Sequence, residues 1–116
     1  MANKLETALA ATGYPWAHHG WSRAPAGTYG VWGEDWSRDL DANGRHVERG
    51  TRCYAALFTR DDSQEPRRKV EQALNDLRCP WRLNSVQYET DTGLIHFEWV
   101  LWFFGELEAP PEPEAI

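Results

Sequence analysis

The chain has 116 residues, a mass of 13.4 kDa, seven tryptophans, two cysteines and a formal net charge of −6. This length suits one domain that buries roughly two thirds of its unfolded surface. Residues 106–116 account for −4 of the charge and leave −2 on residues 1–105, which argues against binding through a basic excess. No apolar run approaches the ~20 residues of a membrane helix, and a signal peptide is not apparent. We therefore expect no membrane partner and synthesis in the cytoplasm.

The first expected element is a short helix over residues 3–12. Leu5 and Leu9 fall at helical spacing there, and Gly13 can take the left-handed conformation that ends a helix. Its apolar face is narrow, which indicates that the helix packs on a sheet. Residues 16–21 then predict a short strand.

Two longer strands and a tight turn are expected next. Residues 29–36 alternate in part and predict a strand. Asn43-Gly44 favours the positive φ angles of a hairpin turn, so residues 45–60 are expected to return as a long strand. The second part of this strand alternates between two sets of residues, which are Cys53, Ala55 and Leu57 on one face and Arg52, Tyr54 and Phe58 on the other.

A second helix follows a turn at residues 61–65. Pro66 suits an early helical position, and Pro80 stops the helix before the next element. Apolar residues recur with the spacing i, i+3, i+4, i+7, which indicates one buried face. These residues are Val70, Ala73, Leu74 and Leu77.

The stretch at residues 81–104 predicts a β-hairpin, with its turn at residues 91–93. Ile95, Phe97 and Trp99 alternate with polar residues, which is typical of a strand with one buried face. From residue 100 to 104 every residue is apolar, so both faces of this strand end are expected to be covered. Either a helix and a loop cover them, or the second face meets another subunit.

These elements predict an α+β fold. We expect an antiparallel or mixed sheet of four to five strands, with two helices packed on one face and the order α-β-β-β-α-β-β. Residues 1–105 form one domain in this interpretation, with Trp99 and Leu74 in one core. Residues 106–116 are acidic and rich in proline, and we expect them to be a disordered tail.

The residue pattern gives no sign of catalysis. Neighbours in an extended strand point to opposite faces, so we do not expect His18 and His19 to bind one metal ion. Cys53 and Cys79 lack a metal or redox spacing and are interpreted as reduced, small core residues. We expect no enzyme activity, no catalytic residue, no metal and no cofactor. Stacking of nucleic-acid bases is an alternative role for Trp32, Tyr54 and Trp102, but the net negative charge of the chain disfavours this role.

The hairpin between residues 39 and 52 is expected to project from the domain as a polar arm, since Val47 is the one large apolar residue in its returning part. Anchoring side chains at its base and arginines along it suit contact with a protein partner. The apolar end of the last expected strand, residues 100–104, is a second candidate for contact with a partner. The candidate subunit or tube interface therefore comprises Trp36, Arg38, Arg45, Val47, Arg49, Arg52, Trp102 and Phe104.

The order of these elements resembles the small tail-completion proteins of long-tailed bacteriophages, and the tail terminators in particular. The likeness covers roughly residues 4–104 and rests on patterns of the fold, because none of its motifs is catalytic. The residues that carry it are Leu9, Gly13 and Pro15; Tyr54, Phe58 and Thr59; Ala73, Leu74 and Leu77; and the strand from Phe97 to Phe104. The high tryptophan content and the acidic tail depart from the family pattern.

This resemblance implies a structural virion protein, assembled in the host cytoplasm and located in the tail or neck of the virion. It implies a homo-oligomeric ring, usually a hexamer, that caps the tail tube, stops tube polymerisation and joins the tail to the head. The implied partners are other copies of the chain, the tail tube protein and the head-tail connector proteins. Two alternatives remain, which are a head-closure or connector protein of the phage neck and a nucleic-acid-binding α+β module.

Overall fold

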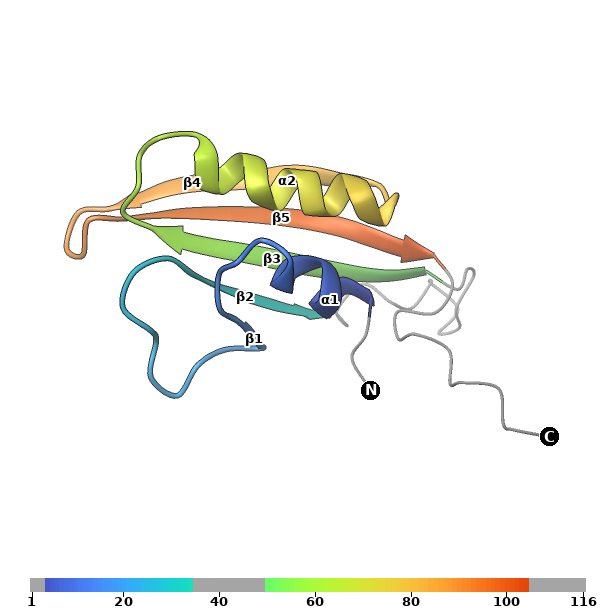
Figure 1. Cartoon of the computed structure of the whole chain (residues 1–116), viewed down its shortest axis with the longest axis horizontal. Coiled ribbons are helices and arrows are strands. Elements are labelled where there is room, and N and C mark those ends of the chain that lie inside the picture. The colour runs from blue at the N-terminus through green and yellow to red at the C-terminus, as the bar shows by residue number, and fades with distance from the viewer. Residues whose placement is uncertain (1–3, 35–49, 105–116) are drawn as a thin grey trace, which may run out of the picture.

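The computed structural model describes residues 4–34 and 50–104 of the chain (Figure 1). The expectations for the hairpin turn, for most of the arm and for the acidic tail fall on residues outside these ranges. The elements follow the expected order and are α1 (Lys4–Ala10), β1 (Trp16–His18), β2 (Tyr29–Glu34), β3 (Gly50–Thr59), α2 (Glu65–Leu77), β4 (Trp81–Glu89) and β5 (Leu94–Phe104). The predicted α+β class and the order α-β-β-β-α-β-β are confirmed.

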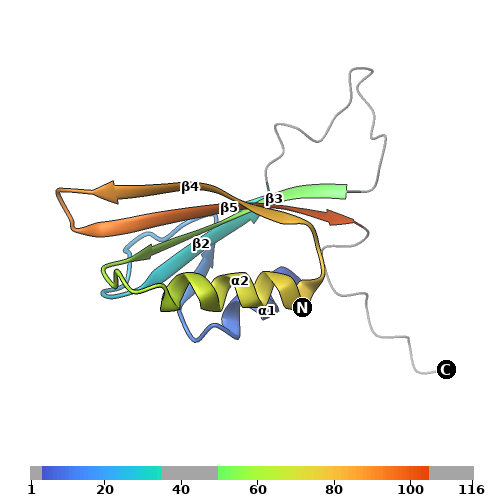
Figure 2. The ribbon, with the colours of Figure 1, turned by 90° about the horizontal axis from the view of Figure 1, so that it is seen from above.

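The five strands form one mixed sheet in the spatial order β1-β2-β3-β5-β4. β1 runs parallel to β2, and every other neighbouring pair is antiparallel. Both helices lie on the same side of the sheet, as Figure 2 shows, so within the described residues one face of the sheet is covered and the other carries no helix. β5, the last of the described strands, lies inside the sheet, between β3 and β4.

The core lies between the helices and the covered face of the sheet. Leu5 and Leu9 of α1 and Val70 and Leu74 of α2 are completely buried against it. The alternation predicted for β3 and β5 is confirmed, because the residues expected inside are buried in one cluster with Leu74, except Ile95, which is partly buried and packs against that cluster. The sheet contributes Trp32, Cys53, Ala55, Leu57, Phe97, Trp99 and Leu101 to this cluster.

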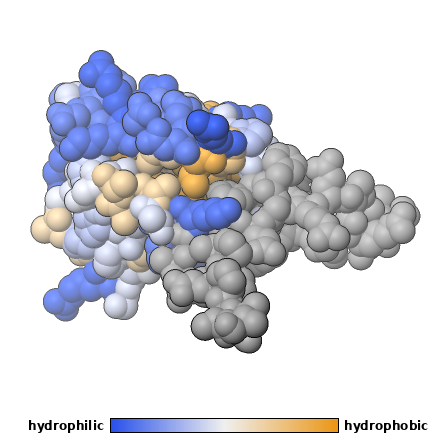
Figure 3. Space-filling view, turned by 45° about the vertical axis from the view of Figure 1, so that its right-hand side comes forward, coloured by the Kyte–Doolittle hydropathy of each residue, from blue (hydrophilic) through white to orange (hydrophobic). Residues whose placement is uncertain are grey.

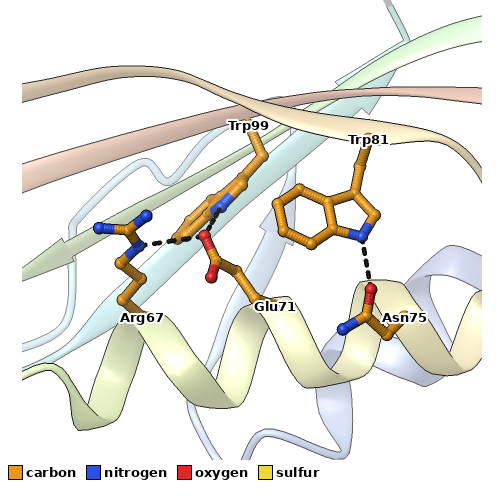
Figure 4. Close-up of polar contacts among 5 residues, drawn as sticks. All are labelled: Arg67, Glu71, Asn75, Trp81 and Trp99. Carbon is orange, nitrogen blue, oxygen red and sulfur yellow. Dashed lines mark hydrogen bonds and ion pairs between the residues drawn. The ribbon is translucent and has the colours of Figure 1, made fainter.

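α2 is fastened to the sheet by two indole groups as well as by its apolar stripe (Figure 4). The buried Trp99 donates its indole N–H to Glu71 Oε2 at 2.9 Å, and Trp81 donates to Asn75 Oδ1 at 2.8 Å. Arg67 Nε also contacts Glu71 Oε2, at 3.1 Å. A buried indole N–H needs an acceptor, so the Trp99–Glu71 bond helps to set the position of the helix along the strands, and the more exposed Trp81–Asn75 bond adds a second contact near its end.

The ends of the elements follow from local backbone geometry. α2 ends at Leu77 because Arg78 adopts the left-handed conformation, with φ of 59°, and its N–H bonds to Asn75 O at 3.0 Å. The strand expected at residues 16–21 stops at His18, because His19 has a φ of 69° and leaves the extended conformation.

The cysteines are free, as predicted, since the structure shows no disulfide between them. Cys53 is buried in the core, whereas Cys79 is half-buried and packs against its edge. Burial raises the pKa of the Cys79 thiol, which keeps it protonated and unreactive at neutral pH. Neither helix in residues 4–34 and 50–104 has the length and apolar character to cross a membrane.

Candidate functional site

The face of the sheet without helices carries a row of stacked aromatic rings. Tyr29 of β2, Phe58 of β3 and His96 of β5 are neighbours in register across three strands. The ring centroids of Tyr29 and Phe58 are 5.0 Å apart, and those of Phe58 and His96 are 4.3 Å apart. This row gives the face without helices, called the open face below, an apolar surface that water still reaches.

A second group on the open face contains two of the predicted interface residues. Arg52 of β3 and Trp102 of β5 are partners in register, so the fold brings them together. The guanidinium of Arg82 lies over the Trp102 ring, 5.8 Å from its centroid, at a distance suited to a cation–π contact. Val100, two residues before Trp102 on the same face of β5, is only 3% exposed.

The other predicted interface residues receive no structural account. Phe104 pairs in register with Gly50 at the end of β5, but its side chain is outside the described part of the structure. The remaining five lie outside the described residues altogether, and they are Trp36, Arg38, Arg45, Val47 and Arg49.

The sequence interpretation missed two exposed large apolar residues of the described part of the chain, which lie on the edge strand β4. Val86 is 52% exposed and Tyr88 is 66% exposed. The register places them on the helix side of the sheet, beside Phe97 and Ile95. The β4–β5 hairpin extends past the first turn of α2, so the helix leaves this part of the strand uncovered (Figures 1 and 2).

A signal for this arrangement is present in the sequence of β4. Trp81 and Leu83 share one face, and the next apolar pair, Val86 and Tyr88, follows one residue out of phase. The structure has a register shift between Leu83 and Ser85, a β-bulge that returns both pairs to the same face. A slip in the alternation of apolar residues therefore marks the bulge.

The outward surface of α2 contrasts with the β4 edge because it is strongly charged. Lys69 pairs with Glu65 at 3.6 Å and Arg67 pairs with Glu71 at 3.1 Å, each four residues apart along the helix. Figure 3 shows hydrophilic residues along the top of the view, where α2 lies in Figure 1, with a smaller hydrophobic area below them. This helix surface suits contact with water.

The second candidate site is a cluster of His18, His19 and Glu34 where β1 ends beside β2. His18 Nε2 lies 2.8 Å from Glu34 Oε1, and His19 Nε2 lies 3.3 Å from the same oxygen. The imidazole of His18 stacks on two other rings. Its centroid lies 4.0 Å from that of the His19 imidazole and 4.0 Å from that of the Trp32 indole. One carboxylate thus holds two stacked imidazoles.

This cluster corrects the expectation that the two adjacent histidines point to opposite faces. That expectation assumes that both residues are extended, but the φ of 69° at His19 turns its ring back over the end of β2. Gly33 makes room for it, because a Cβ at this position would lie 2.6 Å from His19 Nδ1. The N–H of His19 bonds to Trp32 O at 2.7 Å and fixes the turn.

The histidines also change the acidity of Glu34. Burial alone would raise the pKa of this carboxyl group, but the hydrogen bond with His18, a backbone hydrogen bond and the charges of both histidines together outweigh burial. The pKa of Glu34 is therefore lower than its ordinary value, and the group is an ionised acceptor at neutral pH.

Comparison of the chain with protein-family models, with curated proteins and with solved structures finds no match.

Proposed function

We propose that this protein is a structural subunit of a long-tailed bacteriophage, which closes into a ring, caps the tail tube and ends tube polymerisation. In this role it joins the tail to the head, assembles in the host cytoplasm and remains in the virion. The sequence resemblance to tail terminators motivates the proposal. The described residues support it through surfaces that are suited to contact with other protein subunits.

The observation that carries the proposal is the exposed edge of the sheet at β4. Within residues 4–34 and 50–104, this nine-residue strand pairs with β5 on one side and with no strand on the other, and Val86 and Tyr88 lie exposed along it. Exposed edges with large apolar residues invite pairing with another chain, and monomeric proteins usually protect them. A subunit that assembles has a use for such an edge.

The two edges of the sheet differ, which bears on the kind of assembly. The opposite edge is β1, a parallel strand of only three residues. A contact between two different surfaces joins subunits head to tail, and it closes into a ring when the rotation allows. Pairing of β4 with β4 of a second copy gives a two-fold dimer instead. The mass of the assembly in solution distinguishes these outcomes.

The experiment measures the mass of the purified full chain by analytical ultracentrifugation, with and without purified tail tube protein. We expect a closed oligomer of more than two subunits, alone or on the tube. Val86→Lys and Tyr88→Lys place charge on the edge and are expected to reduce assembly. Gln72→Lys, which adds the same charge to the exposed surface of α2, is the matched control.

Tail length in infected cells supplies the functional test. Loss of the protein is expected to give tails of abnormal length by electron microscopy, and the two β4 variants are expected to reproduce this defect. Normal tails with both variants, or a chain that stays monomeric with the tube protein present, would contradict the proposal. Binding to the head connector and not to the tube would instead assign the chain to the head-closure proteins of the neck.

A nucleic-acid-binding module is the second candidate, and the stacked row Tyr29, Phe58 and His96 is the observation that favours it. Aromatic rings on a sheet can stack bases, and Arg82 and Arg52, farther along the same face, supply positive charge. Retention of single-stranded DNA or RNA that weakens with salt and is lost in Phe58→Ala would support this function. The negative charge of the chain makes it the weaker candidate.

A further inference from the structure

We propose that His18, His19 and Glu34 form a binding site for a divalent transition-metal ion, with Zn²⁺ as the expected occupant. The nitrogen and oxygen atoms that these side chains offer all lie within 4.8 Å of one another. Two imidazoles and one carboxylate are ligands that zinc, nickel and copper ions accept. The site is independent of the assembly proposed above.

The two oxygen–nitrogen distances in the cluster match those between ligands around one ion. With metal–ligand bonds of 2.0–2.2 Å, two adjacent ligands of a tetrahedral or octahedral ion lie about 2.8–3.6 Å apart. Glu34 Oε1 lies 2.8 Å from one histidine Nε2 and 3.3 Å from the other. The carboxylate oxygen therefore stands at ligand spacing from both nitrogens.

A metal ion and protons compete for the same atoms of the cluster. Both Nε2 atoms lie within 3.3 Å of one carboxylate oxygen, so an ion bound among these three atoms takes the place of any proton on either nitrogen. The bound ion uses all three atoms as ligands. Binding consequently competes with protons and weakens as the pH falls.

The surroundings hold the histidines close to a binding geometry. The Trp32 indole supports one side of the His18 ring, and the left-handed backbone of His19 returns its ring to Glu34. The planes of the two imidazoles differ by 24°, so the rings must turn away from each other for both nitrogens to point at one ion. The side chains of His18 and His19 are 43% and 53% exposed, which leaves room for this rotation.

Three protein ligands leave at least one position around the ion for water. The ion would connect the end of β1 to the end of β2, next to the loop that joins these strands. Such a connection stabilises the folded state, because the ion binds the assembled ligands and not the unfolded chain. The β1 strand has only three residues, so we expect the bound ion to stabilise this strand more than the rest of the sheet.

The test titrates the tag-free full chain with ZnCl₂ by isothermal titration calorimetry, and with CoCl₂ while its visible absorption is recorded. His46 is replaced by alanine in every sample, since it lies outside the described residues. The variants are His18→Ala, His19→Asn and Glu34→Gln. Asparagine tolerates the left-handed backbone, so His19→Asn removes the ligand and keeps the turn. His96→Ala is the matched control, because His96 also stacks on an aromatic ring.

We expect one Zn²⁺ per chain and visible absorption bands typical of Co²⁺ with nitrogen and oxygen ligands. The melting temperature is expected to rise with Zn²⁺ and to return to its metal-free value when EDTA is added. Each ligand variant is expected to weaken binding about tenfold or more, while His96→Ala leaves it unchanged. Melting curves in EDTA show whether each variant is folded. Absence of saturable binding to the folded chain would overturn the proposal. So would Zn²⁺ binding by His19→Asn and Glu34→Gln that is as tight as binding by the chain with all three ligands.

Discussion

The two faces of the sheet use aromatic residues in different ways. On the covered face, Trp32 and Trp99 are 1% and 0% exposed. On the open face, Tyr29 and Phe58 stack on each other and remain partly exposed. The covered rings are held by the helices, whereas the open rings are held mainly by neighbours on adjacent strands. The covered face thus carries most of the stability, and the open face is available for contacts with other molecules.

Trp99→Ala is expected to have the largest effect. This substitution empties a fully buried position and removes the indole donor from Glu71. Losses of about 3–5 kcal/mol in the free energy of unfolding are typical of such sites. Urea denaturation measures it, with Trp99→Phe as a control that keeps most of the volume but not the hydrogen bond. A loss below about 1 kcal/mol would mean that the covered face does not dominate stability.

Gly30→Ala is expected to rank second. A methyl group here would overlap the ring of Trp16 on the covered side of β2. Overpacking of this kind costs about 1–3 kcal/mol. The same change in a Trp16→Ala background should cost much less, because the ring is absent. Equal costs in the two backgrounds would place the strain elsewhere in the strand.

Phe58→Leu is expected to have a smaller effect on stability, since leucine keeps much of the apolar area and loses the ring contacts with Tyr29 and His96. Aromatic pairs contribute about 0.5–1.5 kcal/mol beyond their buried area. Thermal unfolding measures this loss. A destabilisation as large as that of Trp99→Ala would remove the distinction between the two faces.

Glu34→Gln should change the pH dependence of stability at the edge of the covered face. The pKa of Glu34 is lowered in the folded state, so its ionised form contributes stability above the ordinary value near 4.5, and this contribution is lost as the pH falls through the lower folded-state pKa. The variant should therefore lose less stability than the natural chain on acidification below that value. Urea titrations at several pH values test this, and identical profiles would show that the histidine contacts do not stabilise the carboxylate.

The sequence predicted the elements and their faces well, because periodicity reports burial directly. Residues 81–89 and 94–104 form the expected strands, and the stripe of α2 packs on Trp99 as expected. The sequence did not show the order of strands across the sheet, which depends on contacts between distant segments. The exposed position of Val86 and Tyr88 follows from that order, since β4 is an edge.

The histidine cluster escaped prediction for a different reason. The prediction that neighbouring side chains point to opposite faces holds for extended residues only. A histidine with positive φ is uncommon, and no local sequence pattern predicts it. Only Gly33, which leaves space beside His19, offers a hint in the sequence. The proximity of Glu34 then depends on the parallel pairing of β1 with β2, which is a tertiary contact.

The position of β5 also determines when the protein can fold during its synthesis. Because β5 lies between β3 and β4, the sheet is incomplete until residues 94–104 have left the ribosome. Until then β3 has a free edge and Leu57 and Leu74 lack their contacts with the last strand. Pairing of distant strands is slow, and exposed strand edges promote aggregation. The nascent chain is therefore prone to aggregation until residues 94–104 emerge, and this is the interval in which a chaperone can protect it.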